Sequence, residues 1–282
     1  MAGDGLFQGL RRTLVGVERA LLSDQPSPLE AFIQSGYKAD EHGDYCPRCG
    51  KGVGPHEIKE DRCAACHNQR LPWGGFVRLG TYDGPLREAI HDFKFNRWHT
   101  VGEHLGRALG AAVAERLRLV ARQAQEPESA VLNRSVVVPV PMSAWRRSSR
   151  GIDHASVLAG AVASGAGLPM RRLLRRRHRP AQTGLSGPAR RKNLKGAMIA
   201  AGDTSGLDHV RVFVLVDDVS TTGSTLMEAC RALRGIPNIN QTARVLVACV
   251  GVTDPRRRPS SGSEGLMQPI VEVPGGVLVE KN

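Results

Sequence analysis

The amino-acid sequence predicts an α/β fold, a parallel β-sheet with helices on both faces, preceded by a small metal-binding module. From Phe76 onwards, apolar runs of strand length alternate with amphipathic patterns of helical length. Strands that are buried on both faces are apolar throughout, as is typical of parallel sheets covered by helices. Ahead of Phe76, four cysteines stand in two C-x-x-C pairs, which indicates a separate module stabilised by a metal ion.

Each element follows from its pattern and its boundaries. Residues 28–36 predict a helical turn or two, and the segment 126–134 (EPESAVLNR) is expected to be a loop. Pro85 suits the first turn of a helix, where its missing N–H leaves no hydrogen bond unmade. The predicted strands are 76–82, 135–141, 211–219 and 242–252. The predicted helices of the sheet domain are 85–95, 100–124, 152–167 and 224–235.

Four regions are predicted along the chain. Residues 1–43 hold an amphipathic N-terminal helix and a linker, and this helix is expected to pack on protein more readily than on a membrane. Residues 44–75 form the cysteine module, and residues 76–252 form the sheet domain. Residues 253–282 are rich in Pro, Gly, Ser and charge, which is typical of a flexible tail.

The cysteine spacing predicts a structural zinc site. CPRCG and CAACH each place two sulfur atoms where both can face one ion, and the four thiolates of Cys46, Cys49, Cys63 and Cys66 complete a tetrahedral shell closed to water. A pair of redox or incidental cysteines is the alternative. Cys230 and Cys249 fall in a helical and a strand pattern and are expected to be buried apolar residues.

The amino-acid composition limits the expected binding partners and the cellular compartment of the protein. The chain carries 39 Lys and Arg against 27 Asp and Glu, a net charge of +12, which favours polyanionic partners. No apolar run approaches the roughly 20 residues that cross a bilayer, and arginines interrupt the N-terminal apolar positions, so neither a membrane span nor a signal peptide is expected. The protein is expected to be cytoplasmic, where paired cysteines bind metal more often than they form disulfides.

The segment VFVLVDDVSTTGSTL (212–226) is the most specific functional signal. Asp217 and Asp218 close a buried strand, and a loop rich in hydroxyl groups leads into a helix. Ligands of open parallel sheets bind beyond the carboxyl ends of the strands, and helix N-termini bind phosphate. The two carboxylates suit sugar hydroxyls or hydrated Mg²⁺. An aspartate that only caps the helix would account for one acid but not for two acids beside such a loop.

The same segment resembles the phosphoribosyl-pyrophosphate (PRPP) signature of type I phosphoribosyltransferases. The chain is similar to the ComF family of competence proteins over five segments, which follow one another along residues 44–250. These segments are the four-cysteine module, YDGPLREAIHDFKF, VVVPVPMSAWRRSSRGIDHASVLA, QTGLSGPARRKNLKGAM and this signature. The resemblance implies a type I phosphoribosyltransferase fold, PRPP and Mg²⁺ as ligands, and a role in DNA uptake during natural transformation.

The resemblance also implies roles for individual residues. Asp217 and Asp218 would contact the ribose and serve catalysis. The surrounding PRPP-binding set would be Val219, Ser220, Thr221, Thr222, Gly223, Ser224, Thr225, Lys94, Arg150 and Gly151. A mobile loop over the pyrophosphate would include Arg190, Arg191 and Asn193.

A run of arginines at 171–177 exceeds what pyrophosphate requires. Arg171, Arg172, Arg175, Arg176 and Arg177 could bind the phosphates of single-stranded DNA, or they could form a solvated face. Three functions therefore remain open: a phosphoribosyltransferase with an unknown acceptor, a non-catalytic DNA-binding competence protein, and a docking scaffold for a DNA-uptake helicase or recombination protein.

Overall fold

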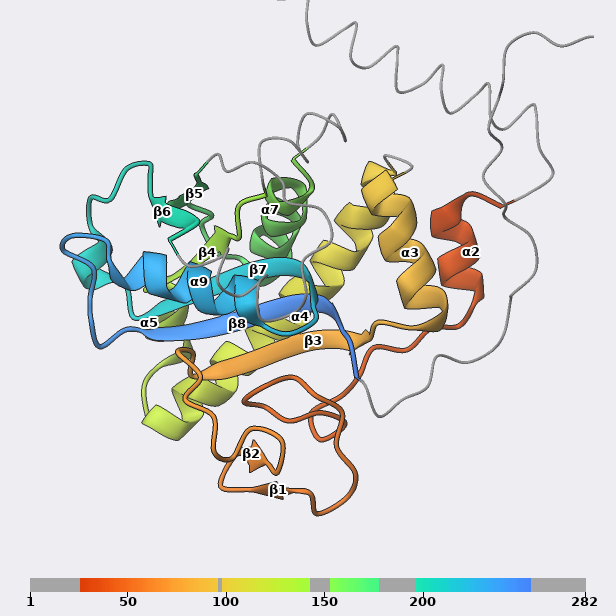
Figure 1. The fold of residues 1–282 in the computed structure, drawn as a ribbon, viewed down its shortest axis with the longest axis horizontal. Helices are drawn as coiled ribbons and strands as arrows, with labels where there is room; N and C mark the ends of the chain where they lie inside the picture. Colours follow the sequence, from red (N-terminus) through yellow and green to blue (C-terminus); the bar gives the residue numbers. More distant parts are fainter. Residues whose placement is uncertain (1–25, 96–97, 143–152, 178–195, 255–282) are drawn as a thin grey trace, which may run out of the picture.

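The structure is a computed structural model that describes residues 26–95, 98–142, 153–177 and 196–254. The predicted N-terminal helix and almost all of the predicted tail lie outside these ranges. A four-stranded parallel sheet in the order β3-β8-β7-β4 forms the centre of the described chain (Figure 1). These strands are β3 (Gly75–Thr81), β8 (Arg244–Val252), β7 (Val212–Ser220) and β4 (Ser135–Pro139).

Helices cover both faces of this sheet because its strands are apolar on both sides. In β7, Val214 and Val216 belong to one buried cluster, whereas Phe213 and Leu215 belong to the other. The first cluster includes side chains of α2 (Pro28–Gln34), α3 (Gly84–Phe95), α4 (His99–Ala124), α5 (Glu128–Leu132) and α7 (His154–Ala166). The second includes side chains of α9 (Ser224–Arg234) and of a small antiparallel pair, β5 (Leu174–Arg176) and β6 (Met198–Ala200).

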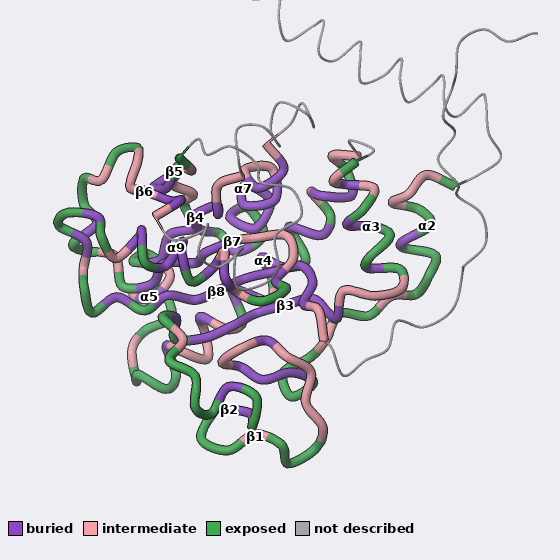
Figure 2. The backbone as a smooth tube through the Cα atoms, viewed as in Figure 1, coloured by how far each residue is buried: buried purple, intermediate pink, exposed green. Residues whose placement is uncertain are grey.

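The predicted α/β architecture with helices on both faces is thereby confirmed. Figure 2 shows the sheet strands buried along most of their length. Helices α4 and α7 pack closely through glycines: a Cβ on Gly110 would lie 2.5 Å from the carbonyl oxygen of Val162. Among the helices of the described ranges, none has both the length and the apolar character needed to cross a membrane.

The prediction of a loop at 126–134 is wrong, because residues 128–132 form the short helix α5. Pro127 sits at its N-cap with φ −57°, and Val131 packs into the core. A five-residue helix shows less than two turns of apolar periodicity, so the pattern could not reveal it. The sequence pattern also gave no signal for β5, β6 or the 3₁₀ turn Leu207–His209, which are each three residues long.

The cysteine module covers the open edge of β3. It contains the short antiparallel strands β1 (Ile58–Lys59) and β2 (Arg62–Cys63), which lie beside the β3 edge of the sheet (Figure 1). The N–H of Phe76 donates to the carbonyl of Pro47 at 2.7 Å, and the N–H of Asp40 donates to the carbonyl of Leu79 at 2.6 Å. The lead-in and the module thus satisfy backbone groups that an edge strand would otherwise expose.

A buried arginine fixes the module to the sheet. Arg78 of β3 has only 2% of its side chain exposed, and its Nη2 lies 2.6 Å from Oδ2 of Asp40. Its Nη1 donates to the carbonyl of Gly50 at 2.8 Å, and its guanidinium lies over the ring of Tyr45. A buried charge is tolerated only when it is paired and hydrogen-bonded in this way.

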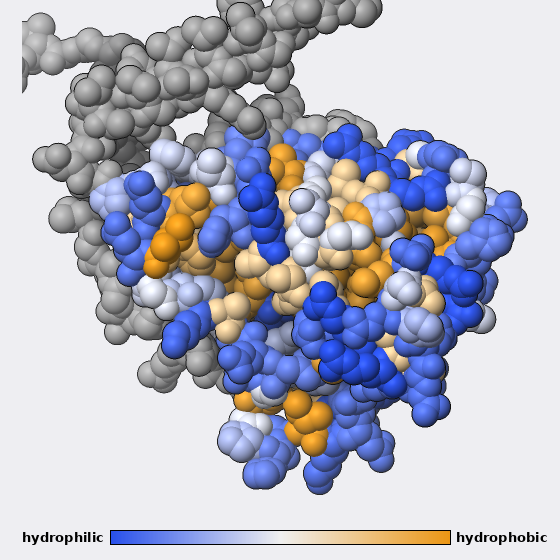
Figure 3. All heavy atoms as spheres, turned by 180° about the vertical axis from the view of Figure 1, so that it is seen from behind, coloured by the Kyte–Doolittle hydropathy of each residue, from blue (hydrophilic) through white to orange (hydrophobic). Residues whose placement is uncertain are grey.

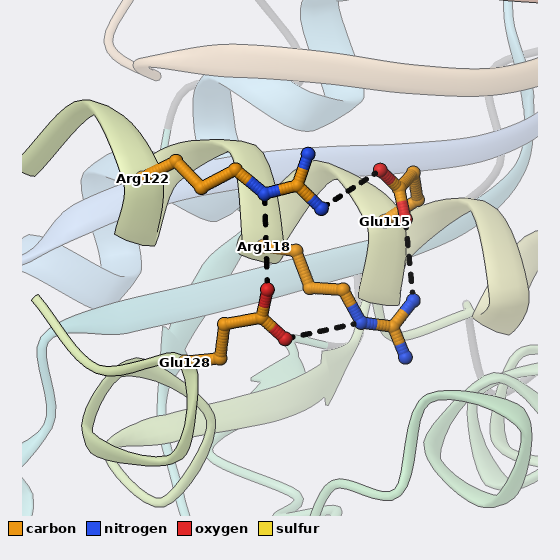
Figure 4. Close-up of polar contacts among 4 residues, drawn as sticks. All are labelled: Glu115, Arg118, Arg122 and Glu128. Atoms are coloured by element: carbon orange, nitrogen blue, oxygen red, sulfur yellow. Dashed lines mark hydrogen bonds and ion pairs between the residues drawn. The ribbon is translucent and has the colours of Figure 1, made fainter.

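The ion pairs between α4 and α5 are of a different kind. Arg118 and Arg122 each contact both Glu115 and Glu128, forming a ring of four charges (Figure 4). These side chains are 42–59% exposed, and the contacts are 3.2–3.8 Å long. Water screens such pairs, so we expect each to contribute little to stability.

The two kinds of pair predict different mutational costs. We expect Arg78→Met to lower the free energy of unfolding by about 3 kcal/mol, because it leaves the partners of a buried cation unpaired. Arg118→Met should cost less than about 0.5 kcal/mol. Urea unfolding of both variants measures the difference, and equal costs would contradict a role for Arg78 in fixing the module to β3.

Candidate functional site

The two predicted acids lie at the carboxyl end of β7, where the backbone holds them in place. Asp217 and Asp218 are half-buried. The N–H of Asp218 donates to Oδ1 of Asp217 at 2.9 Å, and the N–H of Val219 donates to Oδ1 of Asp218 at 2.6 Å. Ser220 is buried, and its carbonyl accepts a hydrogen bond from the N–H of Thr253 at 3.0 Å. These hydrogen bonds therefore hold both carboxylates in place at the end of the strand.

Lys94 lies against this pair. Its Nζ lies 3.0 Å from Oδ1 of Asp218, and only 15% of the Lys94 side chain is exposed. Lys94 stands at the end of α3, the helix that follows the edge strand β3. The structure thus brings together two predicted site residues that are more than a hundred positions apart.

Asp217 is the more perturbed of the two acids. Burial, and then the negative charge of Asp218, raise the pKa of Asp217 to about 7, while the N–H of Asp218 and the positive charges of Lys94 and Arg176 act in the opposite direction. A carboxyl group with this pKa is partly protonated at neutral pH. A cation bound at the pair would favour the ionised form of both acids.

The loop after the acids combines a glycine N-cap with several hydroxyl groups. Gly223 adopts φ +70° at the N-cap of α9 and provides no capping side chain. The hydroxyl groups of Thr222 and Ser224 are 2.7 Å apart, and Thr221 and Thr222 are exposed. First-turn N–H groups and hydroxyl donors therefore gather within a few residues of the acids, an arrangement that suits an anion.

The arginine run at 171–177 does not form one surface. Arg171 donates to the carbonyls of Asp203 and Ser205 at 2.6 and 2.7 Å, so it holds that loop. Arg176 is half-buried and acts electrostatically on Asp217, which places it with the acidic pair. Arg172, Arg175 and Arg177 are exposed. The predicted residues Arg150, Gly151, Arg190, Arg191 and Asn193 lie outside the described residues.

The four cysteines of the module form a cluster that fits a metal ion. Their sulfur atoms all lie within 4.8 Å of one another, with separations of 3.7 Å for Cys46–Cys66, 3.6 Å for Cys49–Cys63 and 3.8 Å for Cys63–Cys66. Four thiolates at about 2.3 Å around one tetrahedral zinc ion are about 3.8 Å apart. The cluster can therefore hold a metal such as zinc. Cys230 and Cys249 are buried in the core, as predicted.

Trp73 is a neighbour of the site that the sequence did not reveal. Its indole lies beneath the loop, and a Cβ on Gly223 would lie 3.5 Å from Cη2 of Trp73. The two residues are about 150 positions apart, and no local pattern links them.

A cavity of about 400 Å³ lies at the opposite end of the sheet, where β7 and β8 begin. It is lined by the end of α4, by α5 and by residues such as Arg211, Asn240 and Arg244. Arg211 is paired with Glu126 at 2.8 Å, and several other lining residues are apolar. We place the candidate site at the acidic pair because the carboxylates, the hydroxyl loop and Lys94 converge there.

One face of the molecule carries both hydrophilic and apolar side chains. Seen from behind, strongly hydrophilic side chains are interrupted by apolar patches (Figure 3). The net charge of +12 is spread over this surface and the remaining chain.

Comparison with known proteins finds relatives that align with most of the chain. No family model matches the chain. It is 33% identical over 192 residues to "Competence protein F" of Haemophilus influenzae, covering 67% of this chain and 78% of that protein. It is 30% identical over 207 residues to "DNA utilization protein YhgH" of Salmonella typhi and 29% identical over 215 residues to the YhgH protein of Escherichia coli K12, in both cases covering 73% of this chain and 82% of the relative.

A solved structure titled "Structure of the allosteric regulatory enzyme of purine biosynthesis" aligns with 54% of this chain and 25% of its own. The sequence identity is 20% and the TM-score is 0.27.

The raised pKa of Asp217 predicts a pH-dependent stability difference. The unfolded chain releases the proton of Asp217 near pH 4, whereas the folded protein retains it up to about pH 7. The free energy of unfolding therefore falls as the pH rises from about 4 to about 7. We expect Asp217→Asn to raise the free energy of unfolding by about 1–3 kcal/mol at pH 8 and to leave it unchanged below about pH 4. Urea unfolding at several pH values tests this prediction, and a constant difference would contradict it.

Proposed function

The chain belongs to the competence protein F family, and on that premise we propose that it binds Mg²⁺–PRPP at the carboxyl end of β7 and acts in DNA utilisation in the cytoplasm. The observation that carries this proposal is the convergence of two half-buried carboxylates with a hydroxyl-rich helix N-terminus. A ribose diol beside a 5′-phosphate has the chemistry that this arrangement complements.

Each part of PRPP corresponds to one part of the site. The 5′-phosphate would lie against Thr221, Thr222, Gly223, Ser224 and Thr225, where N–H and hydroxyl donors are available. The ribose hydroxyls would donate to Asp217 and Asp218. Lys94 is paired with Asp218 at 3.0 Å and would be placed to contact an anionic group of the ligand.

We also propose phosphoribosyl transfer to an acceptor of unknown identity. An acceptor nucleophile would form a bond to C1 of the ribose while the C1–O bond to pyrophosphate breaks, and the electron pair would leave with pyrophosphate. The positive charges of Lys94 and Arg176 would stabilise the charge on that leaving group. Mg²⁺, when bound with PRPP, would add to this stabilisation. We expect Arg150, Gly151 and the loop with Arg190, Arg191 and Asn193 to contribute to the same step.

A second candidate function is non-catalytic binding of single-stranded DNA, with the site recognising a phosphorylated sugar. The exposed side chains of Arg172, Arg175 and Arg177 favour it, because exposed cations can neutralise backbone phosphates. A helicase or recombination protein of DNA uptake would be a suitable partner for the cysteine module. In either case, we propose that the four cysteines hold zinc as a structural ion.

Calorimetric titration of Mg²⁺–PRPP at pH 8, where Asp217 is ionised, tests the proposed ligand. We expect saturable binding to the zinc-loaded protein and at least a hundredfold weaker binding to the Asp217→Asn, Asp218→Asn double variant, because each carboxylate makes charge-assisted hydrogen bonds. Asp208→Asn changes an exposed acid and serves as the control, with unchanged affinity.

Two outcomes would redirect the proposal. No binding to the folded wild type would contradict PRPP recognition and leave the DNA-binding function. Binding without release of pyrophosphate, in the presence of candidate acceptors, would favour PRPP as a regulator of a DNA-binding protein.

A further inference from the structure

The first cysteine turn, residues 46–50, contacts β3 and the segment just before it through three of its carbonyl groups. Those of Pro47, Arg48 and Gly50 accept hydrogen bonds from the N–H of Phe76 at 2.7 Å, Nε1 of Trp73 at 2.8 Å and Nη1 of Arg78 at 2.8 Å. Two of these carbonyls lie between the metal-site residues Cys46 and Cys49. The geometry of this turn, which a tetrahedral metal site would fix, is therefore transmitted directly to β3 and to the residues before it.

The packing around the first cysteine turn leaves its backbone little conformational freedom. Gly50 adopts φ +75°, and a Cβ at this position would lie 2.5 Å from the ring of Phe76. The side chain of Arg48 donates to the carbonyl of Leu71 at 2.9 Å, which ties the turn to the segment that leads to Trp73. A displaced turn would therefore displace Trp73 with it.

Trp73 connects this turn to the loop of the candidate site. Only 4% of Trp73 is exposed, and its side chain belongs to the buried cluster under α9. One end of the indole, Nε1, donates to the cysteine turn, while the other end, Cη2, lies in van der Waals range of the side-chain position at Gly223. A single rigid ring thus extends from the metal site to the N-cap of α9.

We propose that Trp73 is a positioning residue, which carries the metal-fixed geometry of the cysteine turn to the loop 221–223 and so sets the conformation that binds the phosphate group of the ligand. The inference rests on the proposed PRPP site, and it gives the cysteine module a part in that site. A bound metal would then support ligand recognition without touching the ligand.

The four-sulfur cluster supports this role of the module. Its sulfur separations of 3.6–3.8 Å match those around one tetrahedral zinc ion, so the turn is already in the conformation that the metal would hold. Without the metal, few apolar side chains remain to hold the module, because its buried cluster consists of Cys46, Cys63 and Cys66.

Hydrogen–deuterium exchange of the peptide that covers residues 219–228 tests the proposal without any ligand. Trp73→Phe removes the N–H donor and shortens the ring, so both contacts are lost. We expect exchange of the loop amides to accelerate about tenfold, in keeping with the loss of one hydrogen bond and one packing contact. Trp98→Phe is the matched control, since Trp98 packs on the other face of the sheet, and the exchange rate should not change.

Zinc removal provides the second arm. Chelation should accelerate loop exchange in the wild type and in Trp98→Phe, but should add little in Trp73→Phe, because the connection is already broken there. This non-additivity distinguishes transmission through Trp73 from general loosening of the fold. Zinc content and circular dichroism verify that Trp73→Phe retains the metal and its secondary structure.

Two results would overturn the proposal: unchanged loop exchange in zinc-loaded Trp73→Phe, or equal acceleration by chelation in all three proteins. Titration of Mg²⁺–PRPP adds an independent readout, for which we expect about tenfold weaker affinity in Trp73→Phe. If the wild type binds no PRPP, the proposed function fails, whereas the exchange measurements still decide whether Trp73 positions the loop.

Discussion

The candidate site depends on the point at which the central strand β7 changes from apolar to acidic. Val212–Val216 are buried, so the strand is anchored on both faces, and the next two residues must place carboxylates beside the core. Asp217 lies opposite the buried Cys249 of β8, and burial there disfavours its ionised form. Lys94 offsets part of this free-energy cost, because its positive charge pairs with Asp218. A site built in this way suits a cation or a hydroxyl-bearing ligand, as proposed above.

The edge strand β3 sets a second constraint, because its backbone and its buried Arg78 need partners that the sheet itself does not supply. The lead-in and the cysteine module provide them through Asp40, Pro47 and Gly50. Trp73 of the same module also lies beside Gly223, in the loop of the candidate site. We therefore infer that the cysteine module stabilises the sheet edge and also influences the shape of the candidate site. A bound metal would fix the conformation of this module.

The sequence predicted those features that arise from local patterns. Apolar runs located β3, β4, β7 and β8, and paired cysteines located the four-sulfur cluster. The Asp217–Asp218 pair marks the candidate site, and its ligand stays a prediction. The role of Lys94 follows from the family resemblance alone; the structure places it beside Asp218, and its part in PRPP binding stays a prediction. Short elements such as α5 have too little periodicity to be predicted. The separation of Arg176 from Arg171, and the contact of Trp73 with the loop, depend on tertiary packing between distant segments, which no single-sequence pattern encodes.

The most direct test of the central claim is a crystal structure of the zinc-loaded protein with Mg²⁺–PRPP at pH 8. The account predicts the 5′-phosphate within hydrogen-bonding distance of the backbone N–H groups of residues 221–225, and the ribose hydroxyls on Asp217 and Asp218. We also expect the indole of Trp73 to stay beside Gly223, with Cη2 next to the point that a Cβ would occupy. Ligand density elsewhere, such as in the cavity beside Arg211 and Arg244, with the acidic pair still bound only to Lys94, would contradict it.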